Sequence, residues 1–283
     1  MDNLFARFQR VTIRLASGVT AVALISGCSG ETPASALPPY GARPTVVLVH
    51  GAWADTSSWD GEVSALLERG YNVRAVANPL ENLTTDSEYV SAFLKTIPGP
   101  VVLVGHSYGG SVITNAAAGN TNVKALVYVD AAAPAVGETN GALSGPDSVL
   151  KQQPETELFD MMPDPGASPG ATDLYLKREV FLHYFGNDLP TEEATKLWAT
   201  QRAASTNAFE TPSKFAAWET IPSWYFISSG DKIITPASEH AMANRAGSDV
   251  TVFDGGSHLT LISHPGAVTA VIQKAIDFVE HPQ

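Results

Sequence analysis

One serine in a tight turn is the side chain best suited to covalent chemistry. Ser107 is the centre of the pentapeptide Gly-His-Ser-Tyr-Gly at 105–109, which follows the apolar run Val101–Val104 and precedes a segment with helical apolar spacing. A strand, a sharp turn with a central serine and a helix form a nucleophile elbow, in which the glycines allow the bend and the hydroxyl is exposed. The sequence therefore predicts that Ser107 is a nucleophile.

A serine hydroxyl needs a neighbouring base, and the base needs an orienting carboxylate. Asp231 follows the predicted strand 223–228, and His258 follows the predicted strand 249–253. The chain order Ser107, Asp231, His258 is the order expected of a triad built on a nucleophile elbow. We expect His258 to take the Ser107 proton and return it to the leaving group, while Asp231 fixes the imidazole tautomer and stabilises the imidazolium.

Two other aspartates are alternatives for the orienting acid. Asp130 also ends a predicted strand, 123–129, and Asp254 lies only four residues before His258, which makes it the less favoured partner. No cluster of histidine, cysteine and carboxylate residues has metal-ligand spacing, so the sequence predicts no metal site. The other histidines are given no catalytic role: His50, His106, His183, His240, His264 and His281.

The negative charge that develops during acyl transfer needs preorganised N–H donors. One predicted donor is the backbone amide of Tyr108, directly after the nucleophile. The second is expected from the loop that follows the first strand, His-Gly-Ala-Trp at 50–53, where Gly51 permits a tight turn and Ala52 is the expected donor.

Strand and helix patterns alternate along most of the chain. Short apolar runs predict strands at 45–49, 72–77, 101–104, 123–129, 223–228 and 249–253, and helical spacing predicts helices at 57–69, 85–97, 238–245 and 266–279. This alternation predicts an α/β fold with a mostly parallel, doubly wound sheet and helices on both faces. Residues 44–130 and 221–283 are assigned to this core. Residues 131–220 are predicted to form an inserted helical cap, with helices at 174–185 and 192–201.

The beginning of the chain has the order of an export signal. Three arginines within the first fourteen residues precede the apolar stretch Leu15–Ile25, and Cys28, the single cysteine, follows. This run resembles a bacterial lipobox, which predicts a signal peptide over 1–27, a lipidated Cys28 and a flexible tether over 28–43. The expected location is a membrane-anchored lipoprotein at the cell surface or facing the periplasm.

The overall composition limits the possible partners. The chain has 283 residues, a hydrophobic fraction of 44% and a formal net charge of −12. Such a chain has enough apolar residues for a sizeable core. Its strong negative charge argues against nucleic acid and against anionic membrane surfaces as partners, so membrane contact is expected only through a lipid anchor.

These motifs resemble the α/β-hydrolase superfamily from about residue 44 to 279. The stretches 49–59, 78–80, 99–110 and 125–129 are similar to a group of small bacterial serine hydrolases related to plant methyl esterases and hydroxynitrile lyases. The resemblance implies an α/β-hydrolase fold, an inserted cap, no cofactor, and triad roles for Ser107, Asp231 and His258. The lyases carry a threonine where Gly51 stands and a lysine where Leu259 stands, so lyase activity is not expected.

The sequence therefore predicts an exported serine esterase that acts on small, partly apolar ester substrates through an acyl-enzyme. Two alternatives stay open at this point. The same three residues could cleave C–C or amide bonds or support perhydrolysis, and the pocket could bind a small molecule without turnover.

Overall fold

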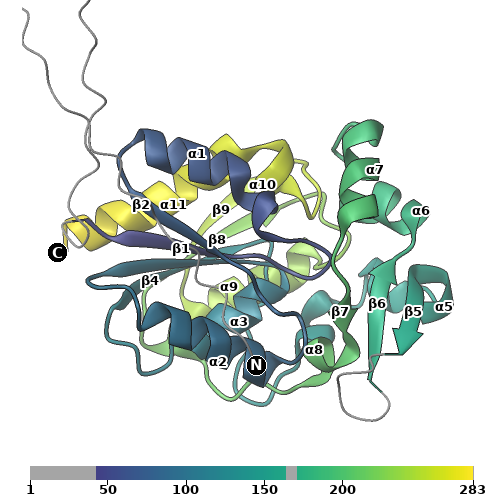
Figure 1. Ribbon diagram of the computed structural model, residues 1–283, viewed down its shortest axis with the longest axis horizontal. Helices are drawn as coiled ribbons and strands as arrows, with labels where there is room; N and C mark the ends of the chain where they lie inside the picture. The colour runs from purple at the N-terminus through teal and green to yellow at the C-terminus, as the bar shows by residue number, and fades with distance from the viewer. Residues whose placement is uncertain (1–42, 164–170, 283) are drawn as a thin grey trace, which may run out of the picture. The chain divides into compact units, whose positions relative to one another are not determined.

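A parallel β-sheet forms the centre of the protein. The computed structural model describes residues 43–163 and 171–282, and within them six strands pair in the order β2-β1-β3-β4-β8-β9, every pair parallel (Figure 1). Strands β1, β3 and β8 are buried at every position, as expected for strands covered on both faces. The strands are β1 Thr45–Val49, β2 Asn72–Val76, β3 Val101–His106, β4 Val123–Val129, β8 Ser223–Ser228 and β9 Asp249–Phe253.

Helices cover both faces of this sheet. Helices α1 and α11 pack on one face, and α2, α3 and α9 pack on the other (Figure 1). Capping residues of the expected kind begin and end them: Asn82 accepts a hydrogen bond from Thr84 N at the start of α2, and Gly247, with φ 64°, ends α9. The elements are η1 Thr56–Trp59, α1 Asp60–Glu68, α2 Leu83–Leu94, α3 Tyr108–Ala116, α9 Pro236–Ala246, α10 Thr260–Ser263 and α11 Pro265–Glu280.

The segment between β4 and β8 is not purely helical. It contains a small antiparallel sheet, β5-β6-β7, as well as short helices. The predicted helix over 174–185 is wrong in its first part, because 172–176 is strand β6, in which Leu174 and Leu176 alternate toward the interior. The elements are η2 Asn140–Ser144, α4 Val149–Gln152, α5 Glu155–Leu158, β5 Phe159–Pro163, β6 Thr172–Leu176, α6 Arg178–Val180, η3 Phe181–Phe185, α7 Thr191–Thr200, β7 Ala204–Ser205, α8 Thr206–Glu210 and η4 Ala217–Glu219.

This inserted segment packs over the carboxyl ends of the core strands. Trp53, in the loop after β1, donates from Nε1 to the carbonyl of Leu174 at 2.9 Å. Arg202 donates to the carbonyl of Asn78, in the loop after β2, at 2.7 Å. The loops that follow parallel strands carry the functional groups of α/β sheets, so the insertion lies over the edge where a site is expected.

The predicted signal peptide, the tether and Cys28 lie outside the described residues. Among the residues that the structure does describe, none of the helices is both long and apolar enough to cross a bilayer.

Candidate active site

Ser107 lies at the sharp turn between β3 and α3. Its backbone has φ 54° and ψ −124°, a strained conformation for a residue with a side chain. A Cβ on Gly105 would lie 2.5 Å from the carbonyl oxygen of Gly109, so the turn can close only with glycine at that position. The Ser107 carbonyl accepts hydrogen bonds from Gly110 N at 3.0 Å and Ala132 N at 3.2 Å. The strained turn is therefore fixed by its surroundings.

The predicted serine, histidine and aspartate side chains lie in one hydrogen-bonded line. His258 Nε2 lies 2.7 Å from Ser107 Oγ, and His258 Nδ1 lies 2.6 Å from Asp231 Oδ2. The second oxygen of Asp231 accepts from the backbone amides of Ile233 at 2.7 Å and Ile234 at 3.2 Å. With Nδ1–H donating to the carboxylate, Nε2 is the nitrogen that accepts from the serine hydroxyl.

Burial controls the charge state of this line. His258 is fully buried, and this burial lowers its pKa to about 3, so the imidazole is neutral near pH 7. Burial also raises the pKa of Asp231 well above its ordinary value, and the amides of Ile233 and Ile234 oppose that shift. The resting imidazole is therefore a free base next to a serine hydroxyl.

The two predicted amide donors flank Ser107. Tyr108 is the first residue of α3, and the N–H groups of a first helical turn have no partner within their own helix. Ala52 is buried in the loop after β1. A Cβ on Gly51 would lie 2.5 Å from Ser107 Cβ, so this loop passes directly beside the serine. Both predicted donors therefore belong to segments next to Ser107, which is where an oxyanion site would need them.

Neither alternative aspartate is hydrogen-bonded to His258. Asp130 accepts a hydrogen bond from the backbone N of Ser228, at the end of β8, at 2.6 Å. Asp254 accepts from the Ser229 hydroxyl at 3.4 Å on the exposed side of the loop. Of the three candidates, Asp231 is the one hydrogen-bonded to the imidazole.

His106 makes a contact that sequence reasoning missed. Its Nε2 lies 2.8 Å from the carbonyl oxygen of His258, and the two rings are 4.8 Å apart between centroids. Because a carbonyl only accepts, His106 Nε2 carries the proton. His106 holds the backbone of His258 in place. Its position beside Ser107 in the elbow was the available signal, but its orientation depends on where the last loop folds.

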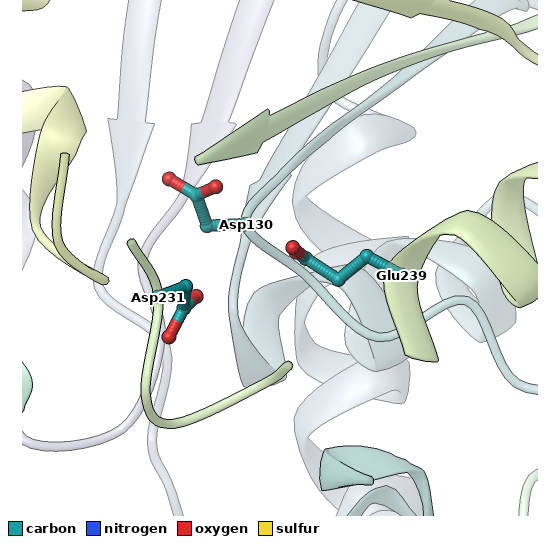
Figure 2. Close-up of side chains that lie close together, drawn as sticks. All are labelled: Asp130, Asp231 and Glu239. Carbon is teal, nitrogen blue, oxygen red and sulfur yellow. The ribbon is translucent and has the colours of Figure 1, made fainter. Parts of the chain in front are cut away.

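The carboxyl group of Asp231 lies close to two other buried carboxyl groups. Oxygens of Asp130, Asp231 and Glu239 lie within 4.8 Å of one another (Figure 2). This cluster was missed at the sequence level, because its members lie far apart in the chain. Burial, with the charges of Asp130 and Asp231, raises the pKa of Glu239, although the nearby Ala131 amide opposes the shift. Both oxygens of each aspartate are hydrogen-bonded, so Glu239 is the member of the three whose oxygens make no hydrogen bond to the described residues.

Aromatic side chains line a cavity between the loop after β1 and the inserted segment. The Trp53 ring stacks on Phe159 and Phe209, with centroids 5.6 and 5.4 Å apart. The cavity has a volume of about 310 Å³, and its lining includes Trp53, Phe159, Leu174, Phe209, Lys151 and Glu210. Ser107 itself is 5% exposed. A ligand in this cavity would contact mostly apolar walls and could also reach the charged side chains of Lys151 and Glu210.

A doubly wound parallel sheet with a serine elbow at its carboxyl edge defines an α/β hydrolase. The chain belongs to the alpha/beta hydrolase family, whose model matches residues 46–271. The predicted resemblance to this superfamily and to plant methyl esterases is thereby confirmed.

Plant esterases are among the proteins that this chain is similar to. A pheophorbidase of Raphanus sativus is 24% identical over 252 residues, which cover 83% of this chain and 94% of the relative. A pFDCC methylesterase of Arabidopsis thaliana is 23% identical over 260 residues, covering 85% and 98%. The crystal structure of polyneuridine aldehyde esterase superposes with a TM-score of 0.69 at 18% identity, covering 82% of this chain and 98% of that one. This last likeness establishes the fold.

Proposed function

We propose that this protein is a serine hydrolase that cleaves carboxylic esters through an acyl-enzyme intermediate. The observation that carries the proposal is the hydrogen-bonded line from Ser107 through His258 to Asp231, with contacts of 2.7 and 2.6 Å. Membership of the alpha/beta hydrolase family and the esterase names of its relatives support the same reaction class.

In the proposed first step, Ser107 Oγ attacks the ester carbonyl while His258 Nε2 takes the hydroxyl proton. The oxygen of the tetrahedral intermediate accepts hydrogen bonds from the amides of Ala52 and Tyr108. His258 then gives its proton to the departing alcohol, and the acyl group stays on Ser107. Asp231 stabilises the imidazolium formed between these two transfers.

In the second step, a water molecule takes the place of the alcohol. His258 removes a proton from this water, which attacks the acyl carbonyl. Collapse of the second tetrahedral intermediate releases the acid, and the proton on His258 returns to Ser107. Every proton in the cycle moves through one nitrogen, Nε2, because Nδ1 remains hydrogen-bonded to Asp231.

The cavity beside Trp53 supports a small, partly apolar substrate. Its volume of about 310 Å³ is at the lower end of the range for small-molecule sites. The aromatic walls favour an apolar acyl or alkyl group. Lys151, Glu155 and Glu210 in the same lining provide polar contacts.

A panel of p-nitrophenyl esters of graded chain length tests this proposal. We expect burst release of p-nitrophenol, a preference for short to medium chains, and loss of about a millionfold in kcat for Ser107→Ala. Ser111→Ala is the matched control, because this buried serine lies on α3 and donates to Asn140 away from His258. Ser107→Ala activity within a few-fold of the wild type would refute the proposal.

We also propose that the protein is exported and anchored by a lipid on Cys28. The support is the order of three arginines, an apolar stretch and the single cysteine within the first 28 residues.

A further inference from the structure

A chain of hydroxyl groups runs from Asp130 to the loop that carries His258. Asp130 Oδ2 lies 2.9 Å from Ser228 Oγ, which in turn lies 2.7 Å from Thr260 Oγ1. Thr260 Oγ1 lies 2.7 Å from the carbonyl oxygen of Ser257, the residue before His258. All four residues are fully buried.

The number of protons in this chain identifies which group donates at each contact. Three contacts share two hydroxyl protons, and the Ser257 carbonyl only accepts, so its contact with Thr260 Oγ1 is a hydrogen bond only when the Thr260 hydroxyl donates. The Ser228 hydroxyl proton must then fill its contact with Thr260 Oγ1, because Thr260 has no second proton to give. No hydroxyl proton remains for the contact between Ser228 Oγ and Asp130 Oδ2. That contact is a hydrogen bond only when the carboxyl group itself supplies the proton.

We propose that Asp130 is a neutral carboxylic acid in the resting protein and donates its proton to Ser228, so that it acts as a positioning residue for the loop of His258. The inference rests on the proposed function, because His258 is taken as the base. It also assigns different charges to the two strand-end aspartates.

The surroundings of Asp130 favour the neutral acid. Burial raises its pKa well above the ordinary value, and the charge of Asp231 adds to this shift, while the hydrogen bond from the Ser228 amide opposes it. The titratable or charged groups that act on Asp130 or on its immediate neighbours are Asp231, Glu239, Asp188, Tyr128, Tyr225, His258, Lys232 and Arg245. Of the two cations in this set, Arg245 is paired with Glu138 at 2.7 Å, and Lys232, next to Asp231 in the chain, lowers the pKa of Asp231.

The neutral acid leaves Asp231 as the anion beside the imidazole. Asp231 accepts three hydrogen bonds, from Ile233 N, Ile234 N and His258 Nδ1, and a carboxylate accepts them best. Two negative charges this close in a buried site would repel each other. A protonated Asp130 removes that repulsion and ties β4 and β8 to the loop before His258.

The same substitution at the two aspartates separates their roles. In Asp130→Asn, the side-chain amide would donate to Ser228 Oγ and its oxygen would accept from Ser228 N, and asparagine tolerates the φ of 43° found at this position. We expect Asp130→Leu to lower kcat/KM by about tenfold to a hundredfold. We expect Asp130→Asn to restore it to within about threefold of the wild type, whereas Asp231→Asn loses about ten-thousandfold. A loss in Asp130→Asn as large as in Asp231→Asn would overturn the proposal.

Two measurements read the proton without any need for turnover. In protein labelled with ¹³C at the aspartate carboxyl carbons, we expect one signal with the shift of a neutral acid at about pH 7, absent from Asp130→Asn and present in Glu239→Gln. The second measurement is the pH dependence of unfolding. Above about pH 5, the equilibrium constant for unfolding of the wild type should rise about tenfold more per pH unit than that of Asp130→Asn. The reason is that the native wild type keeps a proton on Asp130 that its unfolded chain releases.

A ¹³C chemical shift typical of a carboxylate at Asp130 would overturn the proposal, even if the protein is an active esterase. A ¹³C chemical shift typical of a neutral acid would support the proposal, even if the protein has no esterase activity. Calcium or magnesium bound by chelator-treated wild type and lost in Glu239→Gln would also overturn it, because the cluster would then hold a cation in place of the proton.

Discussion

Glu62 on α1 gives a prediction whose size follows from its surroundings. Its side chain is fully buried, and neither carboxyl oxygen makes a hydrogen bond to the described residues. Burial raises its pKa from 4.5 to about 8, although its own backbone amide opposes the shift. The folded protein therefore keeps the proton up to about pH 8, whereas the unfolded chain releases it near pH 4.5.

The sign of the effect follows from this difference. Between the two pKa values the native state binds one more proton than the unfolded state, so stability falls as the pH rises. Each pH unit above the unfolded pKa is worth about 1.4 kcal/mol. Glu62→Gln is uncharged at every pH and lacks this slope. Relative to the wild type, it should gain about 3 kcal/mol in free energy of unfolding between about pH 4.5 and about pH 7.

Urea unfolding of both proteins at a series of pH values measures this gain. The difference in free energy of unfolding between the two proteins near pH 4 provides the baseline. At that pH both side chains are neutral in the folded protein, so the difference gives the effect of replacing the carboxyl group by an amide. Glu68→Gln, at the exposed end of the same helix, is the control and should show no such slope. A Glu62→Gln difference that stays constant from about pH 4 to about pH 8 would show that the folded protein does not hold this proton.

Two further predictions concern the elbow and the anchor. Gly105→Ala should destabilise the protein by about 1–3 kcal/mol or more, because its Cβ would lie 2.5 Å from the Gly109 carbonyl oxygen. Gly266→Ala is the control: its Cβ would have no neighbour within 4 Å, so the midpoint of thermal unfolding should change little. Equal midpoints for the two variants would contradict the close approach at Gly105. Cys28→Ser should abolish partitioning of the expressed protein into detergent, and unchanged partitioning would reject lipidation.

The core of the fold was predictable because its strands carry a local signal. The runs at 123–129, 223–228 and 249–253 match β4, β8 and β9 at both ends. Buried strands such as β4 and β8 are short apolar runs bounded by glycine, proline or polar residues, and that pattern needs no knowledge of the neighbours.

The inserted segment was less predictable because its elements are short. Strand β6 covers only residues 172–176 and lies directly before the helical turns at 178–185. Five residues are too few to separate an alternating pattern from a helical one. Pairing with β5 and β7, which the sequence does not reveal, makes this stretch a strand.

Some residues of the site were predictable from the sequence, and others were not. Ser107, Asp231 and His258 could be chosen because each follows a predicted strand, and parallel strands end at one edge. The contact of His106 with the His258 carbonyl and the cluster around Glu239 could not be chosen. They depend on β4 lying beside β8 and on the orientation of α9, which are tertiary facts.

The proposed mechanism requires that Ser107 is the nucleophile activated by His258. Its most direct test is reaction of the purified protein with a fluorophosphonate probe, followed by mass spectrometry of the labelled peptide. We expect one probe per chain on Ser107, a label absent from Ser107→Ala and much slower to form in His258→Ala. Labelling of another residue, or equal labelling of the Ser107→Ala variant, would contradict it.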